Sequence, residues 1–204
     1  DDAHGDIYYR DLQSSAWVSI SAEEKAANRI RGEGYIDSQP TWSPNNKFIY
    51  FVRRKLGATR ESIVRYSLSD HSVTVITVGL SPAISSDGAA MAFSRRGSII
   101  LRNLVNGKEW PLAKPKIVVD GHPSFARSGK WLYFSRYNSD SNRDRQINGD
   151  DLPIISRIRL EDMRHSRVFP AEALTDRNLR GARPRGISGQ RFLFSGKRAD
   201  TIEV

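Results

Sequence analysis

The feature that most constrains this sequence is a repeat of about 41 residues. Each copy has a proline, a short apolar segment, a polar turn and a second apolar segment that reaches an aromatic residue. Pro40 and Pro82 are 42 residues apart, and Pro82 and Pro123 are 41 residues apart. The copies are residues 40–52, 82–94, 123–135 and, one residue shorter, 184–195. Self-similarity at such a period is typical of architectures built from stacked units.

Each copy predicts a β-hairpin, because turn residues separate two apolar stretches that suit strands. A second hairpin follows in two of the units, so that each unit contains four strands. These second hairpins join residues 63–68 to 73–77 and residues 98–104 to 109–113. A four-stranded sheet of this length cannot cover both of its apolar faces alone, and radial stacking solves the problem. We therefore predict an all-β fold, a β-propeller of four-stranded antiparallel blades, with a two-sheet sandwich as the alternative.

The repeat boundaries predict a single domain over residues 1–204. Complete blades are expected at about residues 38–80, 81–121 and 122–176, with half blades at 1–20 and 182–204. Two half blades could complete one shared blade and close a ring of about four, which would remove open sheet edges. The alternative is that the chain is a fragment of a larger propeller.

The segment Trp42-Ser43-Pro44-Asn45-Asn46-Lys47, followed by Ile49-Tyr50-Phe51, resembles the repeat of TolB-type β-propellers. That family's pattern is a proline, a strand ending in Ser-Pro-Asp-Gly-Lys, and an apolar strand. The resemblance covers nearly the whole chain, although Asn-Asn replaces Asp-Gly in the first copy. It implies a protein-interaction module, similar to the periplasmic modules of bacterial envelopes.

The third unit contains an insertion at residues 138–152, and its side chains predict a calcium site. Oxygen-bearing residues stand at positions 1, 3, 5, 9 and 12 of the loop that starts at Asp140, which is the spacing of EF-hand and dockerin loops. The expected Ca²⁺ ligands are Asp140, Asn142, Asp144, Gln146 through its carbonyl, Asn148 through water, and Asp151. Arg145 occupies the position that is usually glycine. The alternative is a solvated polar hairpin tip with an Asn-Gly turn.

Basic residues recur just after the last aromatic residue of each copy. Arg53, Arg95 and Arg136 stand two residues after it, and Lys197 stands three residues after it. In a radial array these four residues would form a ring, which we call the basic rim, and Arg54, Arg96 and Arg198 would add charge to it. Arginine offers a planar fork to carboxylates, so the rim is the predicted binding site for an acidic partner. The alternative is that each arginine pairs with an acidic neighbour inside the fold.

The net charge of +9 agrees with an anionic partner, but it does not identify one. Nucleic acid is a rival partner, because residues 177–198 contain six arginines, one lysine and no acidic residue. Against it, no cluster of base-stacking aromatic residues lies on a basic strand. The expected partner is therefore a protein, either an acidic peptide or an envelope protein.

Catalysis has little support in the sequence. There is no cysteine, and the four histidines are far apart and form no metal-spaced pair. We therefore expect no enzymatic activity. The alternative class is enzymatic, since TolB-type propellers are also similar to the gating domain of prolyl-oligopeptidase-like peptidases, and some propellers are lyases or hydrolases.

No apolar stretch is long enough to cross a bilayer, so we expect no membrane span. The family resemblance places the expected location in the periplasm or outside the cell. A capping box at residues 21–24 also predicts a short helix through residue 28, to which we assign no function.

Overall fold

The computed structural model describes residues 5–10, 12, 15–20, 34–112, 114–160, 171–175, 179–188 and 191–198. The short helix predicted at residues 21–28 lies outside these ranges. The chain forms two compact units, Asp1–Pro82 and Ala83–Val204, which are described separately. Within the described ranges, no helix has the length and apolar character needed to cross a membrane.

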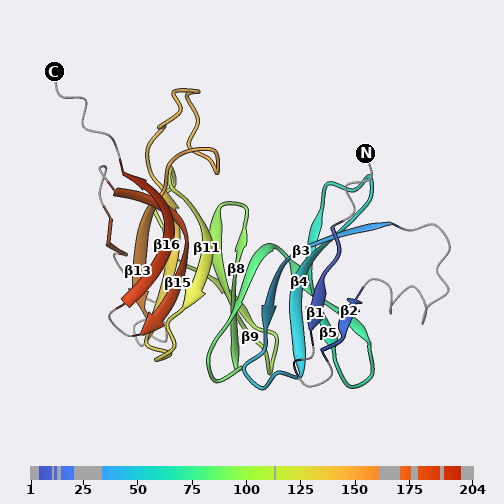
Figure 1. Ribbon diagram of the computed structural model, residues 1–204. Coiled ribbons are helices and arrows are strands. Elements are labelled where there is room, and N and C mark those ends of the chain that lie inside the picture. Colours follow the sequence, from blue (N-terminus) through green and yellow to red (C-terminus); the bar gives the residue numbers. More distant parts are fainter. Residues whose placement is uncertain are drawn as a thin grey trace. The chain divides into compact units, whose positions relative to one another are not determined.

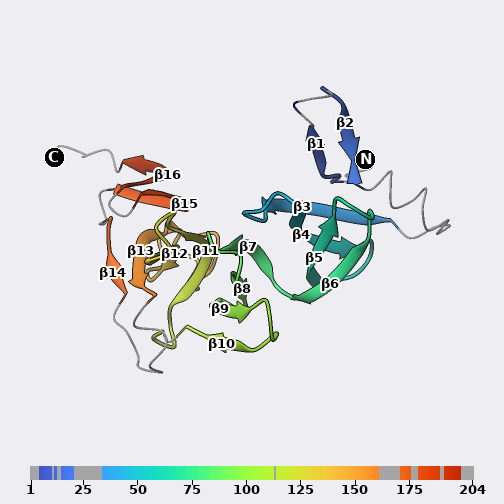
Figure 2. The same cartoon turned by 90° about the horizontal axis from the view of Figure 1, so that it is seen from below.

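The first unit contains a two-stranded sheet and a four-stranded sheet (Figures 1 and 2). Strands β1 (Tyr8–Arg10) and β2 (Trp17–Ser19) form the small antiparallel sheet. The larger sheet contains β3 (Tyr35–Trp42), β4 (Phe48–Lys55), β5 (Glu61–Ser67) and β6 (Val73–Val78), paired in chain order. Every strand in it is antiparallel to its neighbour.

The second unit repeats this arrangement twice and ends in a hairpin. One sheet contains β7 (Leu80–Ile84), whose first residues belong to the first unit, with β8 (Ala90–Arg95), β9 (Ser98–Asn103) and β10 (Glu109–Pro111). The next contains β11 (Val119–Phe125), β12 (Trp131–Tyr137), β13 (Ile154–Arg159) and β14 (Glu172–Ala173). Strands β15 (Leu179–Ser188) and β16 (Arg191–Arg198) form a two-stranded sheet. The predicted all-β architecture of four-stranded antiparallel sheets is therefore confirmed.

The first hairpin of each sheet closes through a tight turn whose chemistry the sequence supplies. In β7–β8, the Ser85 hydroxyl donates to Asp87 at 2.5 Å and accepts the amide of Ala90 at 2.9 Å. The hydrogen bond from Ser85 is the main reason that the pKa of Asp87 lies below its ordinary value. Gly88 has a φ of 73°, which explains why the turn needs glycine.

Main-chain hydrogen bonds recur at the same repeat position within the two units. Each donor is the amide three residues before a repeat proline. Each acceptor is a carbonyl two residues before an isoleucine, which is Ile7, Ile63 or Ile99. The bonds are Asp37 N to Gly5 O at 2.8 Å, Gly79 N to Glu61 O at 3.2 Å, and Asp120 N to Gly97 O at 3.0 Å. The hairpin β1–β2 therefore occupies the place of the third and fourth strands of a sheet.

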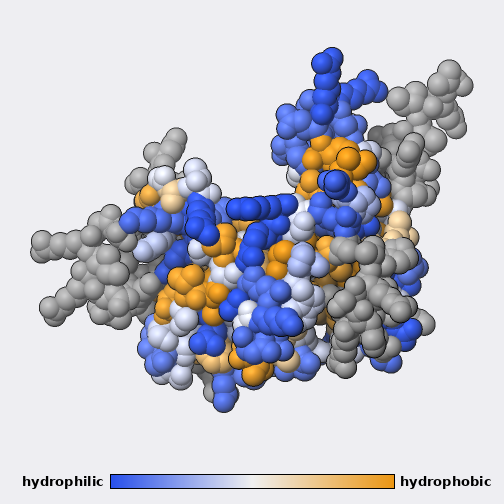
Figure 3. Space-filling model, turned by 180° about the vertical axis from the view of Figure 1, so that it is seen from behind, coloured by the Kyte–Doolittle hydropathy of each residue, from blue (hydrophilic) through white to orange (hydrophobic). Residues whose placement is uncertain are grey.

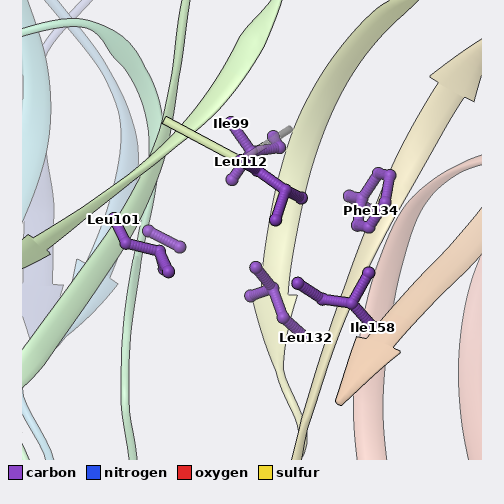
Figure 4. Packing of buried hydrophobic residues seen from close by; sticks show 7 residues of the cluster. Ile99, Leu101, Leu112, Leu132, Phe134 and Ile158 are labelled. Carbon is purple, nitrogen blue, oxygen red and sulfur yellow. The ribbon is translucent and has the colours of Figure 1, made fainter. Parts of the chain in front are cut away.

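The hydrophobic core lies between the faces of successive sheets. In the second unit, side chains of the β7–β10 sheet meet those of the β11–β14 sheet (Figure 4). This cluster contains Ala92, Ile99, Leu101, Leu112, Leu132, Phe134 and Ile158. In the first unit, Ile7 and Ile20 of the small hairpin pack on the β3–β6 sheet, against Phe51 and Tyr66 among others. Face-to-face burial of this kind is what propeller blades require.

Candidate functional site

The first arginine of the predicted basic rim is held inside the fold by an aspartate. Arg53 donates from Nε to Asp37 Oδ1 at 2.8 Å and from its terminal nitrogen to Oδ2 at 2.7 Å. The two side chains are 8% and 0% exposed, so the pair is buried. The guanidinium also lies over the ring of Phe51 at 5.3 Å. A bidentate fork of this geometry uses the donors that would otherwise recognise a partner carboxylate.

Arg136 repeats this arrangement in the second unit. It donates to both oxygens of Asp120 at 2.8 Å and lies over Phe134 at 5.2 Å. Asp120 is opposite Arg136 in the pairing of β11 with β12, as Asp37 is opposite Arg53. Each aspartate stands three residues before the repeat proline, so the aspartate and arginine together form a repeated buried clamp.

Arg95 has a different partner, because Gly79 stands where β3 and β11 have aspartate. Its guanidinium donates to Glu109 at 2.8 Å, and Glu109 also accepts from Arg102 at 2.8 Å. The next residue, Arg96, is exposed and has a φ of 49° in the turn between β8 and β9. Arg54 is partly buried and donates to the carbonyl of Ala58 at 3.4 Å.

Lys197 lies one residue out of register with the three arginines. On β16, Gly196 is opposite Gly181, at the place where the clamp sets arginine opposite aspartate. Lys197 is instead opposite Arg180. The fourth repeat copy is one residue short, which agrees with this shift in register.

The insertion connects β12 to β13 and folds into a succession of tight turns (gold in Figure 1). Several of its acidic and amide side chains accept a nearby main-chain amide. Asp140 accepts the amides of Asp144 at 3.1 Å and Arg145 at 2.9 Å. Asn142 accepts Asp144 at 3.1 Å, Asp144 accepts Gln146 at 2.8 Å, and Asn148 accepts Asp150 at 2.7 Å. Arg143 and Arg145 have φ values of 64° and 69°, so Arg145 adopts the left-handed conformation for which glycine is usual.

Asp151 joins the two ends of this loop. Its carboxylate accepts amides from Asn148 at 2.9 Å and Ser141 at 2.6 Å, and it also accepts the Ser141 hydroxyl at 3.0 Å. The amide of Asn148 is the largest cause that lowers the pKa of Asp151, with burial opposing it. Among the described residues, no three His, Cys, Asp or Glu side chains gather into a metal-binding group.

A set of residues that sequence reasoning missed stands immediately before the repeat prolines. All four adopt left-handed backbone conformations, although the residue before proline normally prefers an extended one. They are Gln39 at 55°, Ser81 at 52°, His122 at 50° and Arg183 at 53°. The pairing register shifts at this point in β3, β11 and β15. Such a bulge re-aims the side chain that it carries. The sequence did offer a signal for this set, because all four residues stand directly before a repeat proline. The usual extended conformation of a residue before proline argued against a left-handed backbone there.

Two successive members of this set are in direct contact in the first unit. Gln39 Oε1 accepts the Ser81 amide at 2.6 Å and the Ser81 hydroxyl at 3.1 Å. In the second unit, the Arg183 amide donates to Ser135 Oγ at 3.1 Å. Burial is the main cause that lowers the pKa of His122, and the positive charge of Arg183 lowers it further.

Exposed apolar side chains occur in separate areas of the surface (Figure 3). On the small hairpin, Tyr8 is 58% exposed and Trp17 is 69% exposed, with Arg10 over the Trp17 ring at 5.6 Å. These apolar side chains do not follow the repeat, whereas the arginine clamps and the pre-proline residues do.

Comparison with solved structures identifies the class of fold. No protein-family model matches the sequence, and no curated protein matches it. TolB from Acinetobacter baumannii is similar in structure, with a TM-score of 0.60 and 17% identity over 96% of this chain and 47% of TolB. An oligogalacturonate lyase from Vibrio parahaemolyticus has a TM-score of 0.60 and 10% identity over 97% of this chain and 54% of the lyase.

A dipeptidyl peptidase 4 from Porphyromonas gingivalis is also similar, with a TM-score of 0.58 and 12% identity over 97% of this chain and 34% of the peptidase. The chain thus spans about half or less of the length of these three structures. Its fold is that of a TolB-like β-propeller. At this identity the likeness concerns the fold alone.

Proposed function

We propose that this chain is a non-catalytic protein-interaction module of the TolB-like propeller type, located in the bacterial envelope, and that it binds an acidic partner. One observation carries the proposal. Of the two adjacent arginines 95 and 96, the first is paired with a carboxylate and the second is exposed. Arg54, after the buried Arg53, donates to the carbonyl of Ala58 and forms no ion pair with a carboxylate of the described ranges. The clamps thus neutralise inner arginines and leave outer cations for a ligand.

A labelled oligoglutamate peptide tests the proposal by fluorescence anisotropy. We expect Arg96→Glu to weaken binding by roughly tenfold, because one attraction becomes a repulsion. Lys130→Glu is the matched control, since it makes the same charge change at an exposed turn residue. Equal losses in the two variants would mean that only net charge matters, and the proposed site would be wrong.

Nucleic acid is the competing polyanion in the same assay. Phosphate-driven binding weakens steeply as salt rises, because counterions are released from the backbone. Tighter binding of a DNA or RNA oligonucleotide than of any acidic peptide at physiological salt would contradict the protein-interaction role.

A gating role in a peptidase is the second candidate, favoured by the similarity to dipeptidyl peptidase 4. The neighbouring sequence in the gene distinguishes the two. A downstream hydrolase domain would support the gate, whereas a signal peptide without a catalytic domain would support the envelope module.

The loop of residues 140–151 is proposed to bind calcium in a structural role. Its turns already place the oxygens of Asp140, Asn142 and Asp144 along one short segment, and Ca²⁺ takes six to eight oxygen ligands. Calcium at a hundred times its Kd should stabilise the fold by about 2.7 kcal/mol. In a chain of this length that raises Tm by roughly 5–10 °C.

Differential scanning calorimetry with and without calcium measures this shift. We expect Asp144→Asn to remove most of it, while Asp150→Asn, outside the proposed ligand set, keeps it. An unchanged Tm in the intact wild-type protein would remove the calcium proposal and leave Asp151 as a purely internal closure of the loop.

A further inference from the structure

Strands β11 and β15 are the first strands of successive sheets, and they contact one another within the second unit. Each carries a bulge at its proline, with His122 on β11 and Arg183 on β15 in the same left-handed conformation. A non-glycine residue in this conformation costs about 1–2 kcal/mol, and the fold accepts that cost at all four repeats. The backbone is therefore fixed by the fold, whereas the side chain it presents differs at every copy.

The first unit reveals how far such a side chain reaches. Gln39 extends from its bulge to the main chain of Ser81, the next residue of the set, at 2.6 Å. His122 and Arg183 are the corresponding pair in the second unit. Their proximity agrees with the effect of the Arg183 charge, which lowers the pKa of both His122 and Tyr137 after burial has acted on each.

Arg183 differs from the arginines of the clamps. It is exposed, and no carboxylate in the described part of the chain forms an ion pair with it. Its amide is already engaged by Ser135, so the guanidinium is the group left to recognise a ligand. The negative charge of Asp150 raises the pKa of Tyr137. A guanidinium without a paired carboxylate offers several N–H donors to an anion.

We infer that Arg183 and His122 form a binding site for a single oxyanion, a carboxylate or a phosphate group, at the bulges of β11 and β15. Arg183 supplies the charge and a bidentate fork, and His122 donates one further hydrogen bond. This site is independent of the acidic-partner surface proposed at Arg96, and small anions are sufficient to test it.

Anion binding at this site is coupled to protonation of His122. In the free protein, burial and Arg183 favour the neutral imidazole, so its pKa is depressed. A bound anion opposes the charge of Arg183 and favours the imidazolium, so it raises that pKa. By linkage, the anion binds more tightly as pH falls through the titration of His122. Arg183 acts on the His122 ring, and Arg183 and Asp150 both act on Tyr137.

Proton NMR of the His122 ring measures the site directly. Sodium acetate and sodium phosphate are titrated separately at constant ionic strength, and the signal is assigned by its loss in His122→Asn. We expect a saturable shift with one or both anions, and acetate binding at least about fivefold tighter at about pH 5.5 than at about pH 7.5. Saturation by acetate alone indicates a carboxylate ligand, and saturation by phosphate alone indicates a phosphate ligand.

Arg183→Asn is the decisive variant, because asparagine tolerates the left-handed conformation and removes the charge. We expect it to abolish saturation while the other histidine signals stay unchanged. Arg127→Asn is the matched control, as Arg127 is an exposed arginine at the turn beyond β11. A shift that never saturates with either anion, or equal losses in the two variants, would overturn the inference. Retained binding in Arg183→Asn would do the same.

Discussion

Asp120→Ala should lower the free energy of unfolding by about 3–5 kcal/mol, which is the cost of leaving a buried charge without its partner. Arg136 is 13% exposed, and its fork donates twice to an aspartate that is fully buried. Alanine removes both acceptors but leaves the guanidinium confined between the strand and the Phe134 ring. Urea denaturation followed by tryptophan fluorescence measures the change.

Two variants separate the clamp from ordinary surface charge. The ion pair of Arg157 with Glu172 is more exposed, with side chains 22% and 53% exposed, so Glu172→Ala should cost no more than about 1 kcal/mol. The double variant Asp120→Leu/Arg136→Met removes both charges and should recover most of the stability. If Asp120→Ala costs no more than Glu172→Ala, the clamp is not a stabilising element.

Phe134→Ala should cost a similar amount, about 3–5 kcal/mol, for a different reason. The ring is fully buried between two sheets, beside Leu132 and Ile158 (Figure 4). Its removal uncovers the Arg136 guanidinium that lies over the ring. It also leaves a cavity that the surrounding strands cannot close, because ladder hydrogen bonds fix them on both sides.

Phe51→Ala should have an effect of the same size in the first unit, where that ring is also fully buried. Leu193 is 62% exposed, so Leu193→Ala should change stability by no more than about 0.5 kcal/mol. Losses below about 2 kcal/mol in both phenylalanine variants would contradict the packing of successive sheets described above.

The fold could be predicted because its signal is local and repeated. Turn residues such as Asp87-Gly88 and the alternation of apolar stretches determine each hairpin within a few residues. The sequence prediction paired residues 98–104 with 109–113, and the structure pairs Ser98–Asn103 with Glu109–Pro111. The strand register of the shortened fourth copy could not be predicted. Counting from the aromatic residue does not show at which position of the hairpin the register shifts.

The candidate site was harder to predict because its contacts are not local. Asp37 lies 16 residues before Arg53, so only the strand register brings the two together. The arginines were predicted to bind a partner because the sequence shows their charge but not whether each one is buried against an aspartate or exposed. The left-handed conformation of His122 contradicts the usual preference before proline, which tertiary packing overrides here.

The hydrogen bonds that recur three residues before the repeat prolines are made by amide and carbonyl groups of the main chain. Substitution of a side chain cannot delete such a bond, and Asp37, Gly79 and Asp120 all donate it despite their different side chains. Mutations can therefore accumulate at these positions while the hydrogen bond is kept. A bond that places no demand on the side chain agrees with the low identity, 10–17%, at which the chain matches its structural neighbours over almost its whole length.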